Sequence, residues 1–136
     1  QIVSQRRCRV CFCPRSNHNL SVGRPAIAKC LQLGIDACLG TDSLASNTDL
    51  SLFSEAHYIL ENYCDVAPES LLVMMTMRGA EALKEGHRFG ALAAGKRSTF
   101  LSISLPGSPS ASQLAEHIIR QGHKGEWTWI NCPQLS

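Results

Sequence analysis

The stretch "CLGTDSLASNTDLSLFSEA", residues 38–56, contains an abrupt change of pattern. The apolar run 35–40 ends in Gly-Thr-Asp-Ser, and apolar positions at helical spacing follow over residues 49–63. In parallel α/β folds, ligands bind at the carboxyl ends of strands, so Asp42 is a candidate site residue. An alternative is that Asp42, with Thr41 and Ser43, only caps the following helix. The local pattern leaves both interpretations open.

The sequence before this stretch predicts a second strand–loop–helix unit. Residues 7–14, "RCRVCFCP", form a short apolar-rich strand stopped by Pro14. Residues 15–23 have turn composition and predict a loop, and residues 24–34 predict a helix between Pro25 and Gly34. Two such units in a row predict an α/β fold with parallel strands.

The carboxyl ends of two parallel strands meet at one edge of their sheet. The segment "PRSN", residues 14–17, follows the first predicted strand as Asp42 follows the second. A shared pocket is therefore expected to contain five side chains: Arg15, Ser16, Asn17, Asp42 and Ser43.

The later half of the chain has a different character. Residues 68–86 predict one or two helices between Pro68 and Gly86. Beyond Gly86 the pattern predicts a strand over 99–105, a helix over 110–121 and a strand over 125–132, which is an α+β arrangement. We therefore divide the chain into residues 1–86 and 87–136.

Composition excludes several classes of protein. The 136 residues are 44% hydrophobic and 18% charged with a net charge of +2, which fits one globular domain and does not favour nucleic-acid binding. No apolar run reaches the roughly 18 residues of a membrane span. Seven cysteines, mostly in apolar runs, predict reduced thiols in a cytoplasmic protein. Cys8, Cys11 and Cys13 form C-x₂-C-x-C, which leaves a zinc site there as an alternative.

Several motifs together resemble the amidohydrolase superfamily of metal-dependent hydrolases. They occur in order between residues 9 and 105: "CPRSN" at 13–17, "GRP" at 23–25, "LGTDS" at 39–43, "LSLFSE" at 50–55, "MTMRGAEAL" at 75–83 and "FGALAAGKRSTFLSI" at 89–103. They are most similar to the branch that deaminates adenosine-like and cytosine-like compounds, with the related chlorohydrolases. The aspartate that the family has after its glycine–lysine pair is absent at residues 96–99.

This resemblance implies a fold. The chain would be the C-terminal part of a (β/α)₈ barrel, with residues 9–13 as strand seven and 35–39 as strand eight. Residues 87–136 would belong to the accessory β-sandwich. The chain begins at Gln1 rather than methionine, and we expect it to be a piece of a longer protein.

The resemblance also implies a chemistry. Asp42 matches the aspartate that binds the catalytic divalent metal, zinc or another, and accepts a proton from the water that the metal activates. The family's histidine ligands and its glutamate come from earlier strands, without counterparts in this sequence. The expected whole enzyme deaminates a small purine-nucleoside-like or related heterocycle. This chain alone is expected to bind no metal and to be inactive.

Another class of function remains as an alternative. The chain could be a non-catalytic domain that forms a homo-oligomer, or that binds the missing N-terminal part of the barrel, through exposed strand edges.

Overall fold

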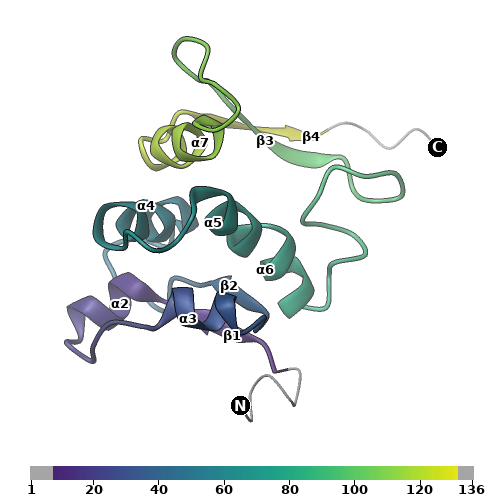
Figure 1. Ribbon diagram of the computed structural model, residues 1–136. Helices are drawn as coiled ribbons and strands as arrows, with labels where there is room; N and C mark the ends of the chain where they lie inside the picture. Colours follow the sequence, from purple (N-terminus) through teal and green to yellow (C-terminus); the bar gives the residue numbers. More distant parts are fainter. Residues whose placement is uncertain (1–7, 132–136) are drawn as a thin grey trace.

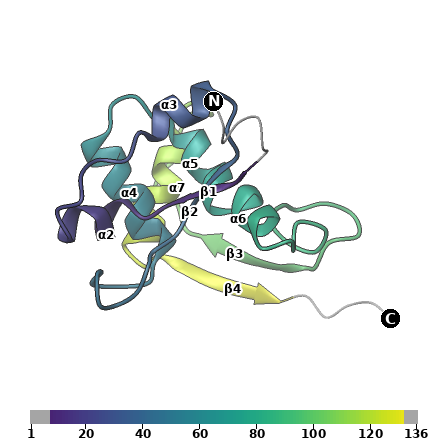
Figure 2. The same cartoon turned by 90° about the horizontal axis from the view of Figure 1, so that it is seen from below.

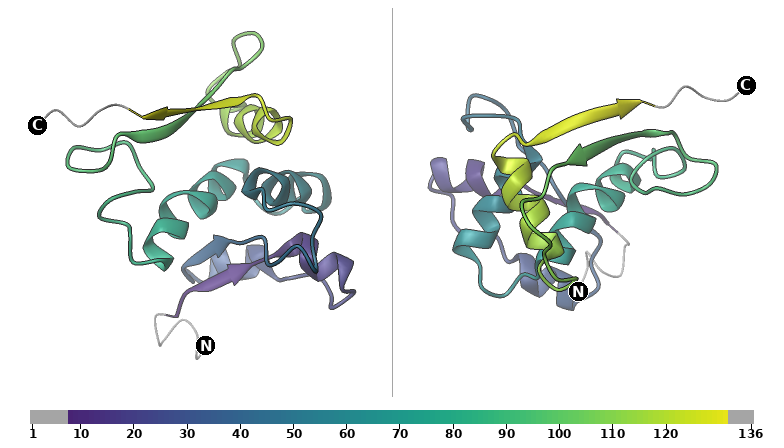
Figure 3. Two further views of the ribbon diagram at one scale, coloured as in Figure 1. Left: turned by 180° about the vertical axis from the view of Figure 1, so that it is seen from behind. Right: turned by 90° about the horizontal axis from the view of Figure 1, so that it is seen from above.

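The computed structural model describes residues 8–131. Helices lie between two small sheets, as Figure 1 shows from the front and Figure 3 from behind. In chain order the elements are β1 (Val10–Phe12), α2 (Pro14–Asn19), α3 (Ile27–Gln32), β2 (Ala37–Leu39), α4 (Leu52–Asn62), α5 (Pro68–Met75), α6 (Met77–Ala82), β3 (Thr99–Ile103), α7 (Leu114–His123) and β4 (Trp127–Asn131).

The first sheet confirms the predicted parallel strand pair. β1 and β2 run parallel, with Phe12 opposite Leu39, and the Gly40 N–H donates to the Phe12 carbonyl at 2.9 Å. All three residues of β2 are buried. Because α2 follows β1 and the loop to α4 follows β2, both loops leave the sheet at its carboxyl edge, as predicted.

The hydrophobic core lies between β2 and the helices. Ala37 and Leu39 of β2 pack with residues of α3, α4 and α5, and Ile119 of α7 joins the same cluster. Apolar burial of this kind supplies most of the favourable free energy of folding. The buried cluster consists of Ile27, Ala28, Ala37, Leu39, Ala56, Ile59, Tyr63, Val66, Leu71, Met74 and Ile119.

The second sheet is an antiparallel pair. β3 and β4 pair from Thr99 opposite Asn131 to Ile103 opposite Trp127, and Figure 2 shows them side by side. Figure 1 shows this pair across α5 and α6 from β1 and β2. Both strands and α7 were predicted from the sequence. Arg7 and Cys132, at the ends of two predicted strands, lie outside the described residues. None of the described helices is both long and apolar enough to span a bilayer.

The prediction of a loop over residues 15–23 was wrong in its first part, because α2 begins at Pro14. The Asn17 N–H donates to the Cys13 carbonyl at 3.0 Å, and the Leu20 N–H to the Ser16 carbonyl at 2.9 Å. Serine and asparagine have low helix propensity, but tertiary contacts routinely override it. Ser16 is buried, and Arg15 forms an ion pair with a distant loop, so contacts outside the segment favour this helix.

Close packing joins α4 to α7 at a glycine. A Cβ added at Gly122 of α7 would lie 2.4 Å from two ring atoms of Phe53 in α4. Gly79 in α6 is different, since its nearest such neighbour, the Met74 carbonyl oxygen, lies 3.7 Å away. The two helical glycines form a matched pair for testing this contact.

We expect Gly122→Ala to lower the free energy of unfolding by about 1–3 kcal/mol, because the methyl group overpacks the interface with Phe53. Gly79→Ala should raise it by up to about 1 kcal/mol, because alanine favours the helix and meets no close neighbour. Urea denaturation of both variants measures the difference. Equal effects of the two substitutions would contradict this packing of α7 on α4.

Two histidines also join α4 to α7. The His57 and His123 rings stack with centroids 4.2 Å apart, and His123 Nδ1 lies 3.3 Å from the Ser54 hydroxyl. Glu61 on α4 and Arg120 on α7 are the charged neighbours of His57. Desolvation and then repulsion from His123 lower the pKa of His57. The folded state therefore binds a proton at His57 less readily than the unfolded state.

This difference predicts a loss of stability in acid. Below about pH 6.5 the unfolded chain takes up a proton at His57 that the folded chain resists, so the free energy of unfolding should fall as pH decreases. His57→Gln should reduce this pH dependence between pH 8 and 5.5, measured by urea denaturation. His117→Gln, elsewhere on α7, controls for the loss of an imidazole. The same pH slope in the wild type and His57→Gln would refute the assignment.

Candidate functional site

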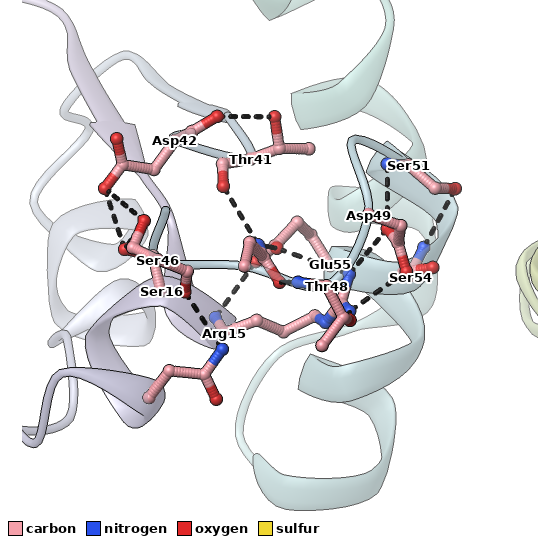
Figure 4. A network of polar contacts seen from close by, with 12 residues as sticks. Arg15, Ser16, Thr41, Asp42, Ser46, Thr48, Asp49, Ser51, Ser54 and Glu55 are labelled. Atoms are coloured by element: carbon pink, nitrogen blue, oxygen red, sulfur yellow. Dashed lines mark hydrogen bonds and ion pairs between the residues drawn. The ribbon is translucent and has the colours of Figure 1, made fainter. Parts of the chain in front are cut away.

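Asp42 follows β2 and presents its carboxylate to solvent. Its backbone lies in the left-handed region, with φ at 58°, a conformation that aspartate tolerates better than most residues. Its Oδ2 accepts hydrogen bonds from the hydroxyls of Ser16 at 2.8 Å and Ser46 at 3.0 Å, which Figure 4 shows on one side of the carboxylate. The orientation of the Asp42 carboxylate is therefore fixed jointly by helix α2 and by the β2–α4 loop.

These donors keep the carboxylate ionised. The Ser16 hydroxyl is the largest cause that lowers the pKa of Asp42, followed by the Ser46 hydroxyl and the Ser43 backbone N–H. Hydrogen bonds to the charged form of a carboxyl group favour that form. At neutral pH, Asp42 is an exposed anion with a fixed orientation.

Asp42 does not cap a helix, so the capping alternative was wrong. Helix α4 begins at Leu52, and its N-cap is Ser51, whose hydroxyl accepts from the Ser54 N–H at 3.4 Å. The loop from Asp42 to Ser51 instead carries the hydrogen bonds of the site, and within this loop the Ser43 hydroxyl accepts the Ala45 N–H.

The other sequence-predicted residues lie in different surroundings. Arg15 donates to both carboxylate oxygens of Asp49, at 2.8 and 3.0 Å, and lowers the pKa of Asp49 mainly through these bonds. Asn17 lines a depression of about 470 Å³ beside His18, to which neither Asp42 nor Ser16 contributes. Of the four residues predicted to share a pocket with Asp42, Ser16 reaches Asp42 through its side chain and Ser43 through its backbone N–H.

Sequence reasoning did not select Ser46, Asn47 or Glu55 as site residues. Glu55 of α4 is fully buried, and its carboxylate accepts from the Arg15 backbone N–H and from Asn47. Burial raises the pKa of Glu55, while these two donors act in the opposite direction. Glu55 lies off the apolar face that the spacing of Phe53, Ala56 and Leu60 predicts, so its place at the end of the "LSLFSE" motif was the one sequence signal that could have identified it.

The chemistry of the donors fits one metal ligand of a site, not a whole site. Asp42 offers a hard carboxylate oxygen, the kind of ligand that zinc and other divalent cations accept. Within residues 8–131, no three histidine, cysteine, aspartate or glutamate side chains converge to hold a metal ion. A catalytic zinc normally has three protein ligands, so the remaining ligands of a site at Asp42 would have to come from outside these residues.

The described cysteines do not form a zinc site either. Cys11 and Cys13 both face Gly40, where an added Cβ would lie 2.6 and 3.3 Å from their sulfur atoms. Burial raises the pKa of Cys13 to about 11, which disfavours the thiolate that binds zinc. The C-x₂-C-x-C alternative is therefore unsupported by the described side chains.

Known proteins with similar sequences are deaminases. The chain is 30% identical over 93% of its length to a 5-methylthioadenosine/S-adenosylhomocysteine deaminase of Teredinibacter turnerae, covering 31% of that protein. It is 33% identical over 77% of its length to a 5'-deoxyadenosine deaminase of Methanosarcina acetivorans, covering 26% of it. The chain thus spans under a third of the length of these curated relatives.

Two solved structures share the fold. An adenosine deaminase of Xanthomonas campestris with bound zinc matches 88% of this chain and 30% of its own, with a TM-score of 0.74 and 27% identity. A guanine deaminase of E. coli matches 93% of this chain and 32% of its own, with a TM-score of 0.75 and 20% identity. The α/β expectation is therefore confirmed.

The match to a family settles the resemblance seen in the motifs. The amidohydrolase family matches residues 1–127, which is most of the sequence and includes Asp42 and the serines that hold it. The chain belongs to the amidohydrolase family.

Proposed function

We propose that this chain is the C-terminal part of a metal-dependent deaminase acting on a purine-nucleoside-like substrate. The observation that carries the proposal is the Asp42 carboxylate, which is ionised, exposed and oriented by two serines at the carboxyl end of β2. The names of the relatives support C–N bond hydrolysis and the substrate class.

The proposed placement in a barrel uses the two sheets. β1 and β2 would be strands seven and eight, and residues 1–86 would hold the last two strand–helix units. In β2, Ala37 and Leu39 belong to the core beside the helices. In β1, the middle residue Cys11 is exposed. Residues 87–136 would form the accessory β-sandwich segment, with the β3–β4 hairpin as its sheet.

Asp42 would have two tasks in the reaction. A zinc ion or another divalent cation, when bound in the whole enzyme, supplies Lewis acidity for water activation, and Asp42 would be one of its ligands. The Asp42 carboxylate would also accept the proton of the attacking water and pass it to the leaving amine. Water adds to the amine-bearing carbon, the C–N bond breaks, ammonia leaves and the carbon becomes a carbonyl.

The neighbours of Asp42 would have different parts. Ser16 would orient the carboxylate, and Ser43, exposed beside it, would line the substrate pocket. Arg15 pairs with Asp49 and Asn17 lines a separate depression, so the proposal gives neither residue a task at the Asp42 carboxylate.

The partner proposed for this chain is the remaining part of the barrel. β1 and β2 are paired only with each other among the described strands, which leaves one outer edge on each for another strand. Association of two copies through these edges is the second candidate, and size-exclusion chromatography at several concentrations separates it from a monomer.

The proposed reaction predicts that Asp42→Asn strongly lowers kcat when it is made in the full-length protein isolated from the cell. Loss of the carboxylate removes a metal ligand and a proton acceptor, so kcat for ammonia release from adenine nucleosides should fall about 10²–10⁴-fold. Asp65→Asn, at an exposed aspartate after α4, is the matched control and should leave kcat unchanged.

The 136-residue chain alone, supplied with zinc and the same nucleosides, should release no ammonia. Zinc-dependent turnover by this chain, or full activity of Asp42→Asn in the longer protein, would contradict the proposal.

A further inference from the structure

We propose that Glu55 is a positioning residue for Asp42, acting through the side chain of Asn47. The proposal deepens the deaminase function proposed above and rests on it for its catalytic meaning. Glu55 does not contact Asp42. Its role would be to fix both the backbone turn at Asp42 and the two serines that orient the Asp42 carboxylate.

Glu55 is held rigidly because it is fully buried and hydrogen-bonded at both oxygens. Its Oε2 accepts the Arg15 backbone N–H at 3.0 Å, and its Oε1 accepts Asn47 Nδ2 at 2.6 Å. The Arg15 guanidinium lies 3.8 Å from Oε1. A buried carboxylate without such partners would be strongly destabilising, so its position depends on these donors.

Asn47 connects Glu55 to the turn that precedes Asp42. Its Nδ2 donates to Glu55 and also to the Thr41 carbonyl oxygen at 2.9 Å, while its Oδ1 accepts the Thr48 N–H at 3.0 Å. Both amide hydrogens and the amide oxygen are therefore engaged, which fixes the orientation of this 7% exposed side chain. Only a side chain with two donors at this position could bond both Glu55 and the Thr41 carbonyl.

The Thr41 carbonyl belongs to the same planar peptide group as the Asp42 N–H. Holding that carbonyl therefore sets the direction in which Asp42 leaves the strand. Asp42 has φ at 58°, and a residue in this region persists where its surroundings determine its conformation. The bond from Asn47 supplies such a constraint.

Glu55 also fixes the two serines through their neighbours in the chain. Ser16 follows Arg15, whose backbone N–H Glu55 accepts, and Ser46 precedes Asn47. The Ser16 and Ser46 hydroxyls lie 2.9 Å apart and both donate to Asp42 Oδ2. In Figure 4, Glu55, Thr48 and Arg15 lie close together, and Asp42 lies beyond Thr41 beside Ser46 and Ser16.

A double substitution separates positioning from a purely structural role. In Glu55→Gln with Asn47→Asp, the new amide can donate to the new carboxylate and still accept the Arg15 N–H. The contact between α4 and the loop is thus kept with its polarity reversed, and the charge of the pair is unchanged. The aspartate has no donor for the Thr41 carbonyl and presents an acceptor oxygen to it, so the constraint on the turn is lost and repulsion replaces it.

The measurement compares crystal structures and amide NMR spectra of the 136-residue chain at pH 7. We expect the double variant to fold with a lowered urea midpoint, while the Thr41 carbonyl moves and the Asp42 and Ser43 amide resonances shift. Glu61→Gln, at an exposed glutamate of the same helix, should leave those resonances unchanged. A folded double variant with the turn at Asp42 unmoved would overturn the proposal. If the double variant does not fold, Asn47→Ala decides by the same criterion.

Activity gives an independent readout in the longer, zinc-loaded protein. The double variant should lower kcat about 10–100-fold, as loss of groups that orient a ligand typically does, with a smaller change in KM. An unchanged kcat would overturn the catalytic role of the positioning. Absence of turnover in the wild type would instead reject the deaminase proposal, and the structures of the 136-residue chain would still decide whether Glu55 and Asn47 as a pair position Asp42.

Discussion

The buried carboxylate of Glu55 is the constraint on which this end of the molecule depends. It joins three segments, because it lies on α4 and accepts hydrogen bonds from the backbone of α2 and from the side chain of Asn47 in the β2–α4 loop. Burial of a charge is costly unless it is fully hydrogen-bonded. The three segments therefore cannot move independently without exposing that carboxylate to solvent or removing its hydrogen-bond donors. Rigidity at the carboxyl edge of β1 and β2 follows from it.

The two acidic residues of this edge have opposite surroundings. Glu55 is buried and has a raised pKa, whereas Asp42 is exposed and has a lowered one. The first is suited to holding the structure, and the second to meeting a cation or a substrate. Because the described residues provide no further converging ligands, the metal ligand proposed at Asp42 would need partners from outside them. This fits a chain that covers under a third of its deaminase relatives.

Much of the fold could be predicted from local sequence signals. Short apolar runs predicted both parallel strands and the later hairpin, and proline and glycine marked the starts and ends of helices. The predicted ends differ from the observed ones by a few residues. Helix α2 was not predicted because its serine and asparagine residues favour turns locally, whereas contacts with distant residues such as Asp42 and Asp49 stabilise the helix. The resemblance of motifs selected Asp42, but Ser46 and Asn47 act through hydrogen bonds to specific atoms, which periodicity and spacing do not encode.

The measurement that tests the central claim most directly is the zinc content of the purified 136-residue chain and of its Asp42→Asn variant after dialysis. Our account treats Asp42 as one ligand of a site completed from outside these residues, so it predicts no stoichiometric zinc in either protein. One zinc per chain in the wild type, lost in Asp42→Asn, would show that these residues form a complete metal site and would contradict the account.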